Sequence, residues 1–157
     1  ETVKAYMPES TTQEHRFVDG YFDFMIERIS WAARHDNKAR QRWWSVLIPI
    51  PQAQLYCEDP MEKGYSPDPK HNFRIDFAFW TGDQIVGVEI DGWEPQGYSA
   101  DVRRNRLLRR AGVDLIHVMN REVEKSCEDV IRKLLPDEIS TPWRHHSEKA
   151  TMPFIPF

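Results

Sequence analysis

Several features that would decide the class of this protein are missing from its sequence. No apolar run approaches the ~18 residues that a membrane span needs, and the N-terminal region does not combine a basic stretch, an apolar stretch and a small-residue cleavage site. We therefore expect a soluble, cytoplasmic protein with no membrane partner. Cysteine is scarce, because only Cys57 and Cys127 occur, far apart in the chain. Without a secretory signal, these residues are expected to be buried thiols rather than a disulfide.

The overall charge is low and slightly acidic. The 157 residues include 21 basic and 25 acidic side chains, which give a formal charge of −4, and 40% of the residues are hydrophobic. These proportions suit one compact domain that buries roughly two-thirds of the surface of its unfolded chain. The acidic total argues mildly against a protein coated by nucleic acid. Because the chain begins with Glu1 rather than Met, we expect an excised or processed piece, for which a fused domain, a partner subunit or a homodimer stays open.

A long helix is predicted near the N-terminus. Thr11 and Glu14 have the spacing of a capping box, and apolar residues follow at intervals of three and four as far as His35. The apolar stripe consists of Phe17, Tyr21, Phe24, Met25 and Ile29.

Prolines divide much of the remaining chain. A short strand is predicted at residues 43–50, which are rich in aromatic and β-branched side chains. Four prolines and a glycine follow in residues 51–71 and predict a long loop, of a kind that is usually functional or an insertion. Residues 136–157 again carry four prolines and little periodicity. We predict a single domain at residues 1–135 and a proline-rich arm at residues 136–157.

The most informative stretch, residues 72–92, alternates with the two-residue period of half-buried strands. Gly82 and Asp83 suit a two-residue type II′ turn, which prefers glycine in the first central position. We therefore predict a hairpin of two strands. One face carries Phe73, Ile75, Phe77 and Phe79, and the other carries Arg74, Asp76, Ala78 and Trp80.

The predicted hairpin brings acidic residues together. With this turn, Asp76 lies opposite Glu89, and Arg74 lies opposite Asp91. Directly opposed Cβ atoms are ~4.5–5.5 Å apart, and like charges held there are destabilising. A hard divalent cation such as Mg²⁺ would remove this repulsion. The alternative is that the acids are solvated on an exposed face.

A basic helix is predicted next. Ser99 suits an N-cap, and Gly112 suits the C-terminal stop after Ala111. The apolar face contains Ala100, Leu107, Leu108 and Ala111, with Arg104 among them. Residues 113–118 then suggest a buried strand, which a right-handed crossover would place parallel to the Glu89 strand.

Taken in order, these motifs resemble the PD-(D/E)XK nuclease superfamily, which has the restriction-endonuclease-like fold. The branch they resemble most is that of very-short-patch-repair endonucleases and related bacterial endonuclease-like domains of unknown function. The matching residues are Arg74-Ile75-Asp76-Phe77, Val88-Glu89-Ile90-Asp91-Gly92, Asp101-Val102-Arg103-Arg104, and Leu108 with Gly112. The resemblance covers about residues 10–125 and implies an α/β fold, a mixed β-sheet flanked by helices in the order αβββαβ.

The resemblance also implies a metal site. Asp76, Glu89 and the backbone carbonyl of Ile90 would bind a catalytic Mg²⁺ or Mn²⁺. Asp91 stands in the position of the usual lysine of the superfamily, which leaves the general base open. Glu14 corresponds to a first-helix glutamate that reaches the metal directly or through water. The histidine that often follows this motif in the branch has no counterpart here, which leaves a histidine-assisted mechanism without its residue.

The expected activity is that of a Mg²⁺- or Mn²⁺-dependent endonuclease, acting on DNA rather than RNA, with DNA repair or antiphage defence implied by the family alone. Arg104 would stabilise negative charge in the transition state, and Arg103, Arg106 and Arg110 would bind the flanking backbone. Each arginine is alternatively ordinary solvated surface. The alternative function is an inactive nuclease-fold module that binds nucleic acid or serves as a subunit of a larger assembly. His117, beside apolar neighbours, is expected to be a buried core histidine.

Overall fold

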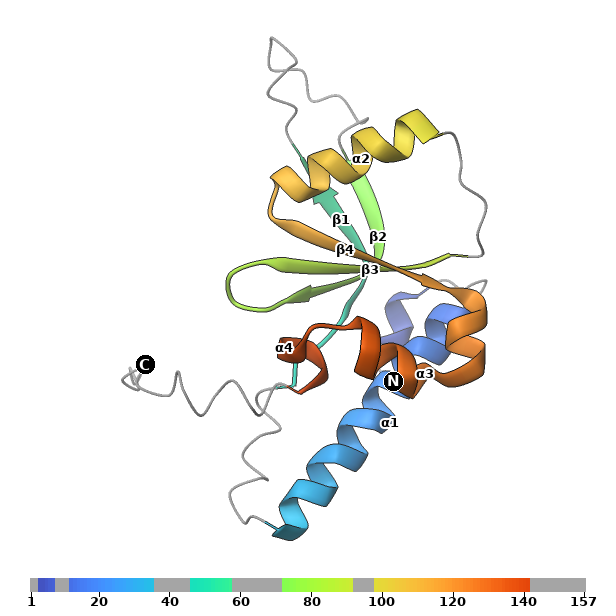
Figure 1. Ribbon diagram of the computed structural model, residues 1–157, viewed down its shortest axis with the longest axis vertical. Coiled ribbons are helices and arrows are strands. Elements are labelled where there is room, and N and C mark those ends of the chain that lie inside the picture. Colours follow the sequence, from blue (N-terminus) through green and yellow to red (C-terminus); the bar gives the residue numbers. More distant parts are fainter. Residues whose placement is uncertain (1–2, 8–11, 36–45, 58–71, 92–97, 142–157) are drawn as a thin grey trace, which may run out of the picture.

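The computed structural model describes residues 3–7, 12–35, 46–57, 72–91 and 98–141 (Figure 1). The fold is α/β, with a four-stranded mixed sheet flanked by helices. Its elements are a 3₁₀ turn at Lys4–Tyr6, α1 (Thr12–His35), β1 (Ile50–Tyr56), β2 (Asn72–Trp80), β3 (Ile85–Asp91), α2 (Tyr98–Arg110), β4 (Val113–Met119), α3 (Asn120–Leu134) and α4 (Asp137–Ser140).

The strands lie in the order β1-β2-β3-β4. β1 is antiparallel to β2, and β2 to β3, whereas β4 is parallel to β3, as the predicted crossover requires. The predicted element order αβββαβ is therefore present, and two helices that the sequence did not predict, α3 and α4, follow it.

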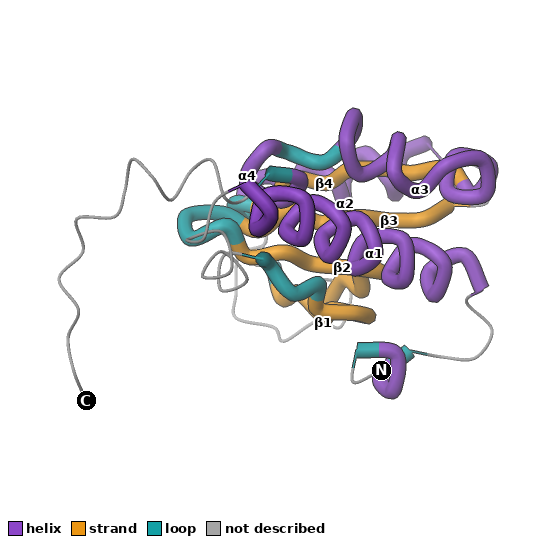
Figure 2. The backbone as a smooth tube through the Cα atoms, turned by 90° about the horizontal axis from the view of Figure 1, so that it is seen from below, coloured by secondary structure: helices purple, strands orange, loops and turns teal. Residues whose placement is uncertain are grey.

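The two faces of the sheet bury separate clusters of apolar side chains. On one face, α1 and α3 pack together against β2 and β3, and the predicted stripe of α1 is buried along its whole length. On the other face, α2 covers Ile75 and Val113 with Leu107 and Leu108. Figure 1 shows α2 on one side of the sheet and α1, α3 and α4 on the other, and from below α1 runs in front of the strands (Figure 2).

The prediction for the first strand is wrong. β1 runs from Ile50 to Tyr56, where a loop was expected, while residues 46–49 have no regular secondary structure and residues 43–45 lie outside the described residues. The prediction treated Pro51 as a breaker, but Pro51 pairs with Phe77 in the strand. Among the described strands β1 has only β2 as a neighbour, and proline is tolerated at such an edge because its missing N–H can face away from the sheet. Of the predicted loop, residues 58–71 lie outside the described residues.

The predicted hairpin is largely confirmed. The register from Phe77↔Val88 to Trp80↔Ile85 is the predicted one. Gly82 has a φ of 107°, a conformation that glycine adopts readily, and the Thr81 N–H donates a hydrogen bond of 3.1 Å to the Gln84 carbonyl.

The predicted division of β2 between two faces is wrong, because the alternation breaks at Asp76. Phe73 and Ile75 pack under α2, whereas Phe77 and Phe79 pack against α1 and α3.

The break coincides with a gap in the register between β1 and β2. Pairing is recorded at Pro51↔Phe77 and at Ala53↔Ile75, but not at the interval between them, where Gln52 lies opposite Asp76. Gln52 has a φ of 51°, in the left-handed region that strands do not otherwise use. This irregularity turns the neighbouring side chains toward opposite faces, which a strict two-residue period cannot anticipate.

Helix α2 differs from its prediction at its start and at one apolar position, and the side chain of Ala100, also predicted for the apolar face, lies outside the described part of the chain. It begins at Tyr98, so that Ser99 lies inside the helix rather than at the N-cap. Gly112 has a φ of 78° and ends it as expected, with its N–H bonded to the Arg109 carbonyl. Leu107 and Leu108 are buried as predicted, but Ala111 is exposed because it lies beyond the last helical residue.

The C-terminal part of the described chain adds to the core. Helix α3 packs against α1, where a Cβ atom on Gly20 would lie 2.5 Å from the Cys127 Sγ. Within the segment predicted as an arm, α4 buries Ile139 completely, and residues 142–157 lie outside the described residues. Cys57 is buried and Cys127 partly buried, and neither forms a disulfide, as predicted. No helix in the described ranges has the length and apolar character to cross a membrane.

Candidate functional site

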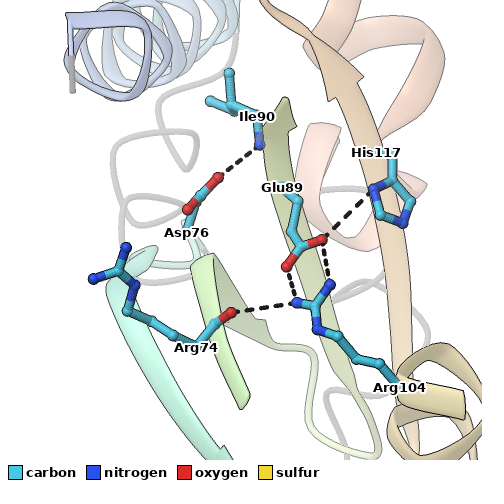
Figure 3. A network of polar contacts seen from close by, with 6 residues as sticks. All are labelled: Arg74, Asp76, Glu89, Ile90, Arg104 and His117. Carbon is cyan, nitrogen blue, oxygen red and sulfur yellow. Dashed lines mark hydrogen bonds and ion pairs between the residues drawn. The ribbon is translucent and has the colours of Figure 1, made fainter. Parts of the chain in front are cut away.

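The candidate site lies across three neighbouring strands, on the face of the sheet that α2 covers (Figure 3). Asp76 comes from β2, Glu89 from β3 and His117 from β4, while Arg104 extends from α2 toward Glu89. The register pairs Glu89 with His117 directly. Folding thus brings together four polar side chains that are far apart in the sequence.

Glu89 is a buried carboxylate with only 7% of its surface exposed. Arg104 Nη1 donates a hydrogen bond of 2.9 Å to Oε2, and Arg104 Nη2 donates to Oε1. A buried carboxylate is costly unless it is paired, and a bidentate guanidinium supplies both charge and geometry. Arg104 therefore acts here as the cation that neutralises Glu89.

Further contacts hold Arg104 in place. Its Nη2 also donates a hydrogen bond of 3.3 Å to the backbone carbonyl of Arg74, and its guanidinium lies 5.9 Å from the centre of the Phe73 ring. The side chain thus faces the sheet, as the apolar spacing of the helix predicts. The cation beside Glu89 is Arg104, whereas Arg74 is exposed and contributes its backbone to the network.

Asp76 lies where the ladder between β2 and β3 opens. The paired positions end at Phe77↔Val88, one step before Asp76 and Glu89 would face each other. In place of ladder pairing, the Ile90 N–H donates a hydrogen bond of 2.8 Å to Asp76 Oδ2. This bond fixes the Asp76 carboxylate beside the Glu89 segment of β3. The predicted pairing of Arg74 with Asp91 is likewise not formed, since the ladder does not reach these residues.

His117 is not the core histidine that was expected. Its side chain is 47% exposed, and its Nδ1 lies 3.6 Å from Glu89 Oε2. The prediction failed because the neighbours of His117 in the sequence are apolar, while its own face of β4 is partly open. Its register position opposite Glu89, which depends on the parallel pairing of β3 and β4, was the signal that would have found it.

Glu14 lies on α1 and is also buried, with 9% of its surface exposed. Its Oε2 accepts a hydrogen bond from the side-chain amide of Gln52 on β1. Sequence reasoning missed Gln52, because no local pattern indicates its left-handed backbone.

The predicted metal ligands are partly brought together. No group of three or more histidine, cysteine, aspartate or glutamate side chains is close enough to hold a metal ion within the described residues. Asp91 belongs to β3 and pairs with Met119, but its side chain lies outside the description. The predicted ligand atoms of Asp76, Glu89 and the Ile90 carbonyl are all oxygens, which suit Mg²⁺ and Mn²⁺. The Glu89 carboxylate already binds one positive group, the Arg104 guanidinium. The charge of these ligand atoms therefore suits a cation.

The predicted phosphate-binding arginines lie on the same helix as Arg104. Arg103, Arg106 and Arg110 are all exposed, while Arg104 turns inward to the sheet. Helix α2 therefore presents positive charge to solvent directly above the buried acid.

Comparison of the chain with protein-family models, with curated proteins and with solved structures gave no match. The function must therefore be argued from the site.

Proposed function

We propose that the protein is a metal-dependent nuclease with a restriction-endonuclease-like fold, which hydrolyses phosphodiester bonds in nucleic acid, DNA rather than RNA. The observation that carries the proposal is the placement of Asp76 and Glu89. They lie on neighbouring strands where the ladder opens, and the more buried of the two already binds a cation. Two fixed carboxylates close to a basic helix would suit the binding of a divalent ion together with a phosphate.

In this proposal, Asp76, Glu89 and the Ile90 carbonyl hold Mg²⁺ or Mn²⁺. The ion, when bound, polarises the scissile phosphate and lowers the pKa of a bound water. The Ile90 N–H keeps the Asp76 carboxylate in position, and His117 Nδ1 lies 3.6 Å from Glu89 Oε2.

Arg104 has two roles in the proposed mechanism. While it is bidentate on Glu89, both carboxylate oxygens are engaged. If Glu89 held the ion, the planar guanidinium of Arg104 would also be suited to bind a phosphate oxygen, because phosphate and carboxylate present similar pairs of acceptors. Arg103, Arg106 and Arg110, exposed on α2, bind the flanking phosphates.

A second candidate function is a nuclease-fold module without activity, which binds nucleic acid or a partner. The pairing of Arg104 with both oxygens of Glu89 favours this candidate, because a carboxylate neutralised by arginine needs no metal. The two candidates differ in whether the ion binds and the phosphodiester is cut.

Cleavage assays separate the two candidates. Labelled single- and double-stranded DNA and RNA would be incubated with the protein and Mg²⁺, Mn²⁺ or EDTA. We expect cleavage only with the metal, and a loss of at least about 100-fold in the nearly isosteric variants Glu89→Gln and Asp76→Asn. Asp114→Asn is the matched control, since Asp114 is exposed elsewhere on β4.

The results that contradict the proposal are specific. Activity that persists in EDTA, or that is unchanged in both carboxylate variants, would exclude the mechanism. Binding of DNA without metal binding or cleavage would favour the inactive module.

A further inference from the structure

Gln52 has an exceptional backbone for its position. Its φ of 51° makes it the one residue other than glycine with a positive φ among the described residues, although it lies within β1. A side chain with a Cβ atom adopts this conformation at a cost, so it persists only where the surroundings impose it. Conformations of this kind cluster at functional sites.

Only one of the two polar atoms in the Gln52 side-chain amide has a hydrogen-bond partner among the described residues. Its Nε2 donates to the buried Glu14 carboxylate, whereas its Oε1 is buried and has no hydrogen-bond partner among the described residues. Exchanging the amide oxygen and nitrogen would place Gln52 Oε1 against the Glu14 carboxylate, and both are acceptors. Oε1 is therefore the amide atom that lacks a partner. A buried acceptor of this kind is normally satisfied by an ordered water or a ligand.

Gln52 also occupies a particular place in the sheet. It lies opposite Asp76, in the interval that the β1–β2 pairing skips. The skipped pair between β1 and β2 thus lies beside the end of the β2–β3 ladder, where the Asp76 side chain accepts a hydrogen bond from the Ile90 N–H. Through Gln52, the Glu14 carboxylate of α1 is linked to the strand position beside Asp76.

We infer that Gln52 is a positioning residue of the acidic site, which holds the Glu14 carboxylate toward Asp76 and offers Oε1 to a water in the hydration shell of a divalent ion. The inference rests on the proposed metal site and extends it to a residue of β1. Mg²⁺ keeps several of its waters in protein sites, and groups that orient ligands and waters around an ion change its affinity typically about 10–100-fold.

The test is calorimetric titration of the full chain with MnCl₂, with no substrate present. Gln52→Gly removes the amide, but glycine adopts the left-handed conformation without strain, so we expect the backbone of β1 to be kept, and a thermal melt checks that the variant folds. We expect Mn²⁺ to bind about 10–100-fold more weakly. Gln54→Gly, an exposed glutamine two residues further along β1, is the control and should bind Mn²⁺ like the wild type.

A second variant covers a failure of Gln52→Gly to fold. Asparagine tolerates the left-handed region but is one methylene shorter, so Gln52→Asn should keep the backbone and lose the contact with Glu14. We expect the same weakening of Mn²⁺ binding. The double variant with Glu14→Gln should lose little more than either single variant, because the two residues act as a unit.

The outcomes distinguish this inference from the proposed function. Wild-type affinity for Mn²⁺ in Gln52→Gly or Gln52→Asn, together with its loss in Glu89→Gln, would overturn the role of Gln52 alone. Absence of Mn²⁺ binding by the wild-type chain would overturn both the metal site and the inference.

Discussion

The guanidinium of Arg104 contacts both oxygens of Glu89, the backbone carbonyl of Arg74 and the ring of Phe73. One side chain of α2 therefore ties the helix to two strands. Because Glu89 is buried, most of its charge balance depends on this one residue.

Replacing Arg104 with a side chain of similar length and no charge tests that dependence. Breaking a fully buried pair costs about 3–5 kcal/mol, and since Arg104 is partly exposed we expect Arg104→Met to lower the free energy of unfolding by about 1–3 kcal/mol. Urea unfolding measures the loss. We expect Mn²⁺ to stabilise this variant more than the wild type, because in the variant the ion does not compete with the guanidinium for Glu89.

A matched control is available on the same helix. Arg106 is exposed, so Arg106→Met should change stability by less than about 0.5 kcal/mol. Equal effects of the two substitutions would show that the contact with Glu89 does not contribute to stability.

The residues of the site differ in how far the sequence can predict them. Asp76 and Glu89 were predicted because a short turn fixes the register of a hairpin, and the register near the turn is confirmed. The inward position of Arg104 followed from helical spacing. Gln52 and His117 were missed because their roles depend on a left-handed backbone and on pairing between distant strands, which no local pattern records.

At the scale of elements, the contact between α1 and α3 is unusually close. A Cβ atom on Gly20 would lie 2.5 Å from the Sγ and 2.7 Å from the Cβ of Cys127. The Cys127 Sγ also lies 3.6 Å from the Phe17 carbonyl as a weak hydrogen-bond donor. The absence of a side chain at position 20 therefore sets the distance between the helices.

This packing predicts the effect of Gly20→Ala. Alanine favours helix by about 1 kcal/mol over glycine, but overpacking costs typically about 1–3 kcal/mol. We expect net destabilisation, measured by chemical unfolding. Ser30→Ala, at an exposed position of α1, should be neutral or slightly stabilising. An increase in stability in Gly20→Ala would show that α3 can move away at little cost.

The same interface predicts a dependence on alkaline pH. Burial raises the pKa of the Cys127 thiol from 9.0 to about 11, and burial also raises the pKa of Tyr21, whose hydroxyl donates to the Leu47 carbonyl. Both groups bind their protons more tightly in the folded state. Their contribution to stability is complete below the pKa values of the unfolded chain and is lost as the pH rises.

We therefore expect the free energy of unfolding to fall between about pH 9 and pH 11 as the unfolded thiol ionises first. Denaturant titrations across this range measure the slope. Cys127→Ala should make the slope shallower, and an unchanged slope would mean that this thiol does not contribute.

Elements were predicted where the signal is local. The stripe of α1, the turn at Gly82 and the stop at Gly112 each follow from a few neighbouring residues. β1 was misplaced because proline is compatible with a strand at an edge or beside a bulge, and neither feature can be read from neighbouring residues alone. Helix α3 contains Ser126 with extended dihedral angles, which interrupts the helical period.

At the scale of the whole molecule, the distribution of charge matters more than its sum. The chain has a formal charge of −4, yet α2 exposes several arginines above the buried Glu89. If these residues bind phosphates, affinity for DNA will fall as salt rises, with a slope set by the number of contacts.

The slope gives a quantitative test. Arg106→Ala together with Arg110→Ala should weaken DNA binding and reduce the slope of log affinity against log salt by about 2, one unit for each phosphate contact. Arg132→Ala is the control, since Arg132 lies on α3 and pairs with Glu128. Equal slopes for all the variants would place the DNA-binding surface elsewhere on the protein.

Pro51 has a further consequence for how copies of the chain meet. An edge strand presents a row of backbone N–H and C=O groups, to which a strand from another molecule can add, and this is a common start of aggregation. In β1 the ring of Pro51 removes one donor from the backbone, and the left-handed Gln52 next to it bends the strand. Among the described strands, the proline that misled the prediction of the fold thus makes this edge a poorer template for the addition of another strand.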